Sequence, residues 1–218
     1  MLRNKIIFSI LALCALMFNT SCSKNTTTDN TTPTELDGTW VSGCISGGFG
    51  IYSKRTFATS GNSFTNTEIT YSDSSCLDAN KMSKFVDTGT FALGDVVSIS
   101  DVIAATSSTK KFDWVVSKLV ITPLRTDVAS DYNTASGGAG YCSVTTWVKD
   151  QETNVTDKSC TDIKSSGTTF YDIYKLDTSA TPNTLTFGNP LADPTKDRST
   201  DAKRPSTLYT GTNVFTKQ

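Results

Sequence analysis

Beyond residue 36, apolar and polar positions alternate along the chain in short runs, separated by turns rich in glycine, serine and asparagine. A period of two is typical of a β-strand with one buried face, because successive side chains point to opposite faces of a sheet. Two of the separating stretches, Ser60-Gly61-Asn62 and Gly94-Asp95, are typical of hairpin turns. The pattern predicts about nine strands, at residues 38–46, 51–59, 63–71, 87–93, 96–103, 111–122, 141–149, 168–176 and 184–188.

The run at residues 111–122 is apolar on both faces. Strict alternation places Phe112, Trp114 and Val116 on one face, with Leu119 and Ile121 on the other. A buried helix would show the same apolar content. The β-branched residues of the run and the proline that follows it favour a strand.

Two segments do not alternate. Residues 126–140 are rich in glycine, serine and asparagine, and they predict a long loop. Residues 189–218 are polar and contain three prolines, so we expect them to wrap the domain without adding a regular strand. The chain shows no internal repeat and no convincing amphipathic helix.

Short strands with hairpin-type spacing indicate an all-β, antiparallel architecture, either a barrel or a sandwich. A sandwich of the immunoglobulin type has a widely separated cysteine pair that brackets a tryptophan, and the cysteines here do not fit that arrangement. We therefore expect a small up-and-down barrel of about 8–10 strands.

The first residues have the layout of a secretory signal. Arg3 and Lys5 precede an apolar run at residues 6–18, and small polar residues lead into Cys22. The run is about 13 residues long, whereas a membrane-spanning helix needs about 20. Ordinary signal cleavage and an uncleaved anchor are the alternatives to the processing described next.

The residues before Cys22 resemble a bacterial lipobox. That resemblance implies cleavage after Ser21, acylation of Cys22 and, from Ser23, sorting to the outer membrane of the bacterial cell envelope. The expected organisation is a signal peptide at residues 1–21, a lipidated cysteine and disordered tether at 22–35, and a single barrel domain at 36–218. Residues 23–35 contain no large apolar residue, which is typical of disorder.

Charge and composition exclude several classes of function. The chain has 20 basic and 21 acidic residues, so it lacks the excess of Lys and Arg that marks nucleic-acid binding. There is no histidine, which excludes Ser-His-Asp and Cys-His catalysis and every His-ligated metal site. We expect no catalytic residue, no metal and no cofactor.

Of six cysteines, Cys44, Cys76, Cys142 and Cys160 remain after Cys14 leaves with the signal and Cys22 is acylated. An even number in an oxidising compartment favours disulfides. Three pairings are possible. We expect Cys44–Cys76 and Cys142–Cys160, because each pair lies within one local stretch of chain. A four-cysteine zinc site is the alternative, although no C-x₂-C spacing is present.

Several short motifs resemble known families. Gly38-Thr39-Trp40 resembles the G-x-W start of lipocalin-like barrels, and with Cys44, Tyr52, Arg55, Phe57 and Cys76 it resembles the barrel domain of the adenomatosis-polyposis-coli down-regulated Wnt-inhibitor family. The second half, with Cys142, Trp147, Cys160, the run 167–176 and the run 204–208, resembles bacterial lipoproteins of unassigned activity. These resemblances imply a lipocalin-like barrel that holds an apolar ligand such as a lipid.

Few acidic residues are candidates for chemistry. Glu68 is in step with Phe64 and Asn66 on one strand, yet a solvent-facing position is the simpler interpretation. Asp127 and Asp131 share the predicted loop, where turn formation explains them better than calcium binding does. The pairs Lys110-Lys111 and Lys203-Arg204 are expected to be solvated.

Aromatic and aliphatic side chains of the predicted strands are candidates for the lining of an interior cavity. They either enclose a ligand or fill the barrel, since an eight-stranded barrel is just wide enough for either. The candidates are Trp40, Phe91, Phe112, Trp114, Tyr171 and Ile173.

The expected function is therefore that of a membrane-anchored, non-enzymatic lipoprotein whose barrel binds a small apolar molecule or lipid. The alternative is a structural module of the cell envelope that docks a partner protein through residues 126–140 and 189–218. An enzyme acting on envelope polymers is a third possibility.

Overall fold

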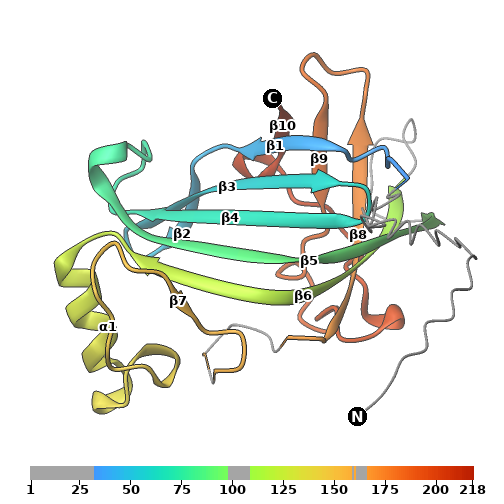
Figure 1. Ribbon diagram of the computed structural model, residues 1–218. Coiled ribbons are helices and arrows are strands. Elements are labelled where there is room, and N and C mark those ends of the chain that lie inside the picture. Colours follow the sequence, from blue (N-terminus) through green and yellow to red (C-terminus); the bar gives the residue numbers. More distant parts are fainter. Residues whose placement is uncertain (1–31, 98–108, 159, 161–165) are drawn as a thin grey trace, which may run out of the picture. The chain divides into compact units, whose positions relative to one another are not determined.

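The computed structural model describes residues 32–97, 109–158, 160 and 166–218. Eight antiparallel strands form a closed barrel in which each strand pairs with the next one along the chain, so the barrel is of the up-and-down type (Figure 1). The predicted fold class is confirmed. The barrel strands are β1 (Gly38–Ser42), β3 (Ile51–Ser60), β4 (Ser63–Tyr71), β5 (Lys81–Val97), β6 (Thr109–Pro123), β8 (Thr169–Asp177), β9 (Thr184–Phe187) and β10 (Phe215–Lys217).

Short elements complete the fold. Strand β2 pairs with β3 outside the barrel path, and β7 pairs with β6. These elements are β2 (Ile45–Gly48), β7 (Thr153–Asn154), the helix α1 (Thr126–Gly138), and the 3₁₀ turns η1 (Asp78–Asn80), η2 (Tyr141–Ser143), η3 (Asp201–Lys203) and η4 (Gly211–Asn213). Among the described residues, no helix is both long and apolar enough to cross a membrane.

Strand β1 closes the barrel because it pairs with β3 on one side and with β10 on the other. Trp40 lies opposite Phe57 in the first pairing and opposite Lys217 in the second. The prediction that residues 189–218 add no regular strand is therefore wrong. Strand β10 is only three residues long, too short to show a period of two, but it carries the buried side chain of Phe215 into the interior.

The β5–β6 hairpin is longer than predicted. Strand β5 continues through Gly94 and Asp95, where a turn was expected, because its pairing with β6 extends as far as Val97 opposite Thr109. Gly94 and Asp95 lie within a register shift of the ladder, because Leu93 pairs with Phe112 whereas Val96 pairs with Lys110. Of the predicted strand 96–103, residues 98–103 lie outside the described residues.

A second register shift in this hairpin, between Thr88 and Gly89, leaves Ser117 as an extra residue in β6. An extra residue reverses the faces of the strand beyond it. Leu119 and Ile121 therefore point to the same side as Phe112 and Trp114, and not to the opposite side as strict alternation predicts. Gly89 permits the close approach of the two strands, since a Cβ there would lie 1.9 Å from the carbonyl oxygen of Val115.

The interior at the closed end of the barrel is packed. Leu36 and Trp40 have no solvent-exposed surface, and the indole Nε1–H of Trp40 donates to the carbonyl of Leu36 at 2.7 Å. The chain is already held in place one residue earlier, because Glu35 accepts hydrogen bonds from Lys110 and Tyr174. Glu35 therefore belongs to the folded domain and not to the tether predicted at residues 22–35, of which residues 22–31 lie outside the described residues. The predicted signal peptide and Cys22 lie outside the described residues.

Helix α1 and the segment after it cover the β5–β6 hairpin at the end opposite its turn, where Ser83 pairs with Pro123 (Figure 1). Residues 126–140 were predicted as a loop and residues 141–149 as a strand, and both predictions are wrong. Trp147 packs against Tyr132 and Tyr141 rather than joining the sheet. The amide of Asn133 replaces the missing strand partner: it accepts a hydrogen bond from the N–H of Trp147 at 2.6 Å and donates to its carbonyl at 3.0 Å.

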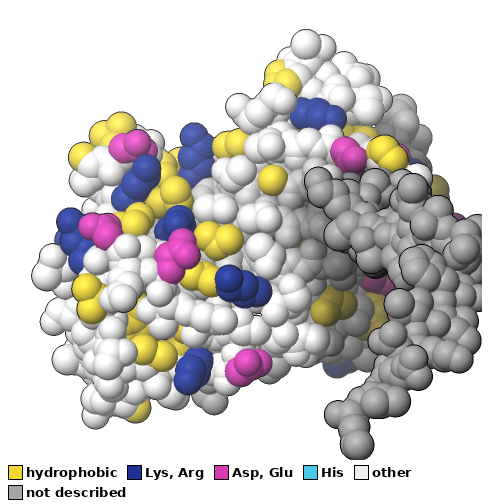
Figure 2. Space-filling view, viewed as in Figure 1, with side chains coloured by type: hydrophobic (Ala, Val, Ile, Leu, Met, Phe, Trp, Pro, Cys, Tyr) yellow, Lys and Arg dark blue, Asp and Glu magenta, His cyan; other side chains and the backbone are white. Residues whose placement is uncertain are grey.

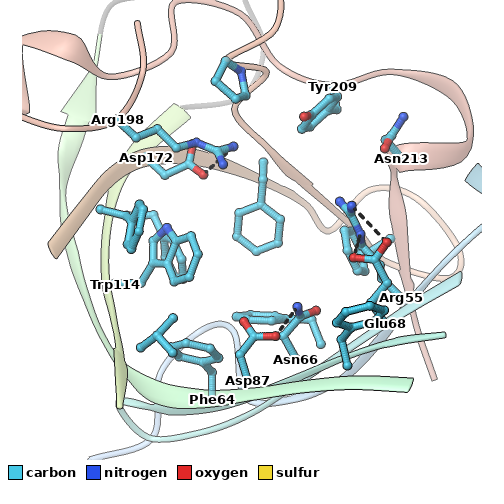
Figure 3. Close-up of a pocket in the computed structure, with 18 of the residues that line it drawn as sticks. Arg55, Phe64, Asn66, Glu68, Asp87, Trp114, Asp172, Arg198, Tyr209 and Asn213 are labelled. Carbon is cyan, nitrogen blue, oxygen red and sulfur yellow. Dashed lines mark hydrogen bonds and ion pairs between the residues drawn. The ribbon is translucent and has the colours of Figure 1, made fainter. Parts of the chain in front are cut away.

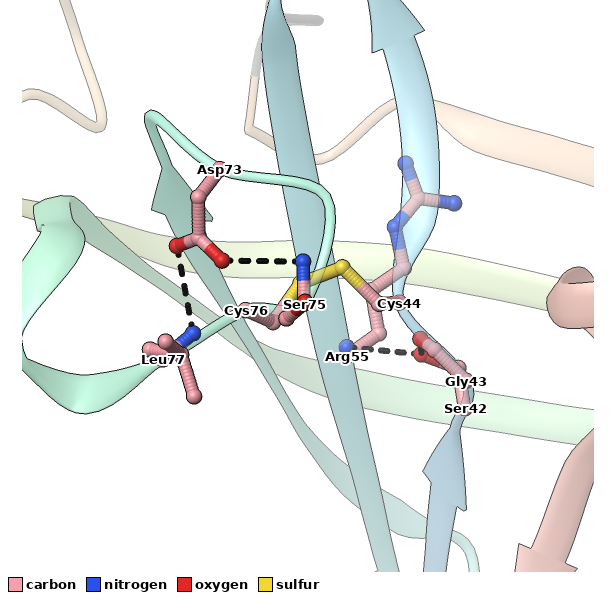
Figure 4. Close-up of a disulfide and its surroundings, with 8 residues drawn as sticks. All are labelled: Ser42, Gly43, Cys44, Arg55, Asp73, Ser75, Cys76 and Leu77. Atoms are coloured by element: carbon pink, nitrogen blue, oxygen red, sulfur yellow. Dashed lines mark hydrogen bonds between the residues drawn. A yellow bond between two sulfur atoms is a disulfide. The ribbon is translucent and has the colours of Figure 1, made fainter.

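Both predicted disulfides are present. Cys44–Cys76 ties the segment after β1 to the β4–β5 connection, where Asp73 accepts hydrogen bonds from the backbone N–H groups of Ser75 and Leu77 (Figure 4). Cys142–Cys160 closes the segment that packs on α1. The two bridges therefore constrain two separate parts of the chain.

We predict that removing either bridge destabilises the protein. In the loop-entropy model, sequence separations of 32 and 18 residues each correspond to about 3–4 kcal/mol. The double variants Cys44→Ala/Cys76→Ala and Cys142→Ala/Cys160→Ala should each lose up to that much unfolding free energy in urea denaturation. A loss below ~1 kcal/mol in both would show that the bridges do not constrain the unfolded chain.

Candidate ligand-binding site

A pocket of about 810 Å³ opens inside the barrel (Figure 3). Inward-facing residues of β3, β4, β5, β6, β8, β9 and β10 line it, together with residues from the long β9–β10 connection. The connection adds Pro190, Leu191 and Pro194, and Leu191 is 81% exposed. The barrel is therefore packed at one end and hollow beyond it, so neither of the two simple expectations, filled or hollow, describes the whole interior.

Nine of the 22 residues that line the pocket are aromatic. Phe57 contacts Phe187 with ring centroids 5.2 Å apart, and Trp114 stacks on Phe170 at 4.5 Å. A wall rich in aromatic side chains, with a few polar groups among them, is typical of small-molecule sites. The aromatic residues that line the pocket are Phe57, Phe64, Phe85, Phe112, Trp114, Phe170, Phe187, Tyr209 and Phe215.

Polar side chains line the pocket from the same inward face of the strands as the aromatic ones. On the sheet, Asn66 lies between Phe57 of β3 and Asp87 of β5. Glu68 lies in the next inward row, between Arg55 and Phe85. Residues opposite one another on paired strands share a face, so strict alternation carries these polar side chains inward.

Glu68 is bound by an arginine. The Nε of Arg55 lies 3.0 Å from Glu68 Oε2, and both side chains line the pocket. The interpretation of Glu68 as a solvent-facing strand residue is therefore wrong. Its neighbours Phe64 and Asn66, four and two residues earlier, point to the same face and would have indicated this.

Asp87 has a weaker set of partners. The Nδ2 of Asn66 donates to Asp87 Oδ1 at 3.0 Å, and no cation of the described chain lies within ion-pair distance. Desolvation raises the pKa of Asp87 to about 6, and the Asn66 hydrogen bond opposes that shift only in part. The carboxyl group is thus ionised at neutral pH in a poorly solvated place.

Asp172 faces the pocket from β8, on the side opposite Asp87 in the view of Figure 3. Its carboxylate lies 3.0 Å from Arg198 Nη2, while burial raises its pKa to about 6. Arg198 also donates to the carbonyl of Gly188 at 2.7 Å. Gly188 leaves room for this arrangement, because a Cβ there would lie 2.4 Å from Asp172 Oδ1.

Arg204 fastens the β9–β10 connection to the outside of β8. Only 8% of Arg204 is exposed. It donates to Asp201 at 2.7 Å and to the carbonyl of Asp172 at 2.6 Å, and its guanidinium lies 5.3 Å from the ring centroid of Tyr171. The prediction of a solvated Lys203-Arg204 pair is therefore wrong for Arg204.

The predicted cavity residues divide into three groups. Phe112 and Trp114 line the pocket, whereas Trp40 and Phe91 lie in the packed core. Tyr171 and Ile173 point outward, because they pair with Asp113 and Lys111 on the outer face of β6. The inward residues of β8 are their immediate neighbours Phe170 and Asp172.

The described residues contain no group of three or more Cys, Asp or Glu side chains arranged to hold a metal ion. Asp127 pairs with Arg125, and Asp131 lies on helix α1. On the face shown in Figure 2, basic and acidic side chains are interspersed and form no broad patch of one sign. The described residues thus show no metal-ligand cluster, and this face shows no basic patch of the kind that binds nucleic acid.

Comparison of the chain with protein-family models and with curated proteins gives no match. The function is therefore argued from the pocket itself.

Arg204 offers a first test of the site's framework. Arg204→Ala should lower the unfolding free energy by roughly 2–3 kcal/mol, because it leaves the buried carbonyl of Asp172 without its donor and removes the ion pairs to Asp113 and Asp201. Arg204→Lys should restore only part of the lost unfolding free energy, since one ammonium group cannot replace the several N–H donors of the guanidinium. Lys203→Ala is the control: Lys203 is half-exposed and its ion pair is 3.5 Å long, so its loss should cost less than ~1 kcal/mol. Equal losses of unfolding free energy in Arg204→Ala and Lys203→Ala, measured by urea denaturation, would show that Arg204 does not fasten the β9–β10 connection to β8.

Asp87 offers a second test, by pH. A folded-state pKa of about 6, above the ordinary 3.8, means that ionisation of Asp87 reduces stability as pH rises through this interval. Asp87→Asn should therefore be more stable than the parent by ~1–2 kcal/mol at pH 7.5, a value reduced from the full shift because the pocket is open to water. The gain should vanish near pH 4. A variant that is equally or less stable at pH 7.5 would contradict an inward-facing, desolvated carboxyl.

Proposed function

We propose that this protein is a ligand-binding lipoprotein of the bacterial cell envelope. The barrel holds one small, mainly apolar molecule, such as a lipid, and the chain is anchored to the outer membrane through an acylated Cys22. The observation that carries the proposal is the aromatic-lined pocket of about 810 Å³ inside the closed barrel. Its size and lining are typical of sites that enclose small molecules, as the resemblance to lipocalin-like barrels implies.

The two segments considered for docking a partner protein are used within the fold. Helix α1 contributes Val128 and Ala129 to buried packing, and residues of the β9–β10 connection line the pocket. Part of each segment is therefore already packed within the fold, which favours ligand binding over the role of an interaction module. The binding role needs no catalytic residue.

A pair of neighbouring substitutions tests the binding role. Val116 lines the pocket, whereas Val115 lies on the opposite face of the same strand. The exported full chain carrying Cys22→Ser should copurify with, or take up from a lipid extract, one small molecule per chain in native mass spectrometry. Val116→Trp should weaken or abolish the adduct because the indole projects into the pocket, and Val115→Trp should retain it. Absence of any adduct in the parent would overturn the carrier role.

The anchor is tested separately. Metabolic labelling with palmitate should mark the parent chain and not Cys22→Ser. Equal labelling of the two chains, or none in either, would overturn acylation at Cys22 and leave the pocket proposal standing.

A further inference from the structure

Charge in the pocket is unevenly compensated. The charged side chains that line it are Arg55, Glu68, Asp87, Asp172, Asp197 and Arg198. Arg55 pairs with Glu68, Arg198 with Asp172, and Asp197 with Lys203. Within the described part of the chain, Asp87 alone of this set makes no ion pair. The pocket therefore presents one carboxylate without an ion-pair partner to whatever occupies it.

The carboxylate of Asp87 is directed at the pocket. Asn66 holds Oδ1 from the neighbouring strand at 3.0 Å, and Figure 3 shows both side chains turned toward the open space. Asn66 is the sole side-chain donor to Asp87 among the described residues. Burial also raises the pKa of Asp87 to about 6, so a cation that reached this carboxylate would relieve an unfavourable desolvation.

The surroundings of Asp87 suit an organic cation. Phe85 is on the same face of β5, Phe64 precedes Asn66 on β4, and Phe57 lies across from Asn66 on β3. Aromatic faces attract alkylammonium groups through their quadrupoles while still packing against the apolar remainder of a ligand. A carboxylate among aromatic rings is therefore a site for a charged group on an otherwise apolar molecule.

Other charged ligands fit less well. Both arginines of the pocket are already paired with carboxylates, so an anionic ligand would have to displace Glu68 or Asp172. A calcium or magnesium ion needs about six or more oxygen ligands, whereas Asp87 has one amide neighbour and aromatic walls. The chemistry favours a monovalent organic cation.

We propose that the ligand is an amphipathic organic ammonium compound whose positive group lies against Asp87 and Asn66 while its apolar part occupies the aromatic pocket. This inference rests on the proposed binding function and names the class of ligand. It assigns Asp87 the role of counter-charge and the Phe57–Phe64–Phe85 surface the role of ammonium-binding wall.

Three probes with the same alkyl chain test the sign of the charge: decyltrimethylammonium, decan-1-ol and decanoate. Each is titrated, below its micellar concentration, into the exported full chain carrying Cys22→Ser. Intrinsic fluorescence reports binding because Trp114 lines the pocket, and calorimetry gives the affinity. The ammonium compound should bind about tenfold or more tightly than the alcohol, a difference of ~1.4 kcal/mol. Decanoate should bind more weakly than the alcohol.

Two matched variants locate the effect. Asp87→Asn keeps an acceptor for Asn66 but removes the charge, so the ammonium compound and the alcohol should then bind within about twofold of each other. Asp95→Asn makes the same change at an exposed position of the same strand, outside the pocket lining, and should keep the full preference.

The outcomes separate the two proposals. Alcohol binding without a preference for the ammonium compound, or a preference that survives in Asp87→Asn, would overturn this inference and leave the carrier role intact. Failure of all three probes to bind, with no adduct in native mass spectrometry, would overturn both.

Discussion

The whole structure depends on the double pairing of β1. This strand forms hydrogen-bonded ladders with β3 and with β10, and so joins the beginning of the domain to its last residues. A sheet that is closed in this way has no free edge on its barrel path and only one inward face. Every inward residue of the eight strands is then forced toward a common interior, where it either packs or lines the pocket.

The interior is divided between packing and binding. At the closed end, Leu36, Trp40, Phe91 and Tyr174 belong to one buried hydrophobic cluster. Leu119 and Phe85 belong to the second cluster, to which α1 contributes Ala129. The pocket lies between the two clusters and takes lining residues from both. The chain thereby keeps a stable core while leaving part of its apolar surface available to a ligand.

The two aspartates that line the pocket both have a pKa raised to about 6 by burial, but they differ in their partners. Asp172 is offset by Arg198 and by a glycine that makes room for it. Asp87 has one amide partner and no cation, which costs stability at neutral pH. Functional sites commonly retain groups that a folding criterion alone would remove. That contrast is the reason for assigning the ligand's charge to Asp87.

Sequence reasoning was most successful where alternation was long and unbroken. Alternation predicts the two strands within residues 51–71 and the inward positions of Phe112 and Trp114. Closeness along the chain predicts the pairing of Cys44 with Cys76. Sequence reasoning failed where one extra residue reverses the faces of a strand. The bulge at Ser117 is such a case, because it turns Leu119 toward the barrel interior. It also failed for Tyr171 and Ile173, because β8 is apolar on both faces and its outer face is covered by the β9–β10 connection.

The role of β10 could not be predicted, because a three-residue strand has almost no pattern and gains its stability from two partners distant in sequence. The inward direction of Asp87 and Asn66 could have been predicted, since each lies two residues after an inward phenylalanine, Phe85 or Phe64. Polar residues on a strand are, however, ordinarily assigned to solvent. Only the closed barrel shows that their face is the inner one.

Amide hydrogen exchange at the C-terminus tests this closure most directly. The Lys217 N–H donates to the carbonyl of Asn183 and the Gln218 N–H to the carbonyl of Thr39, each at 2.9 Å. The account predicts that both amides exchange at least ~100-fold more slowly than in an unstructured peptide. Exchange of both at the rate of a free chain end would show that the barrel is open and would contradict the enclosed pocket.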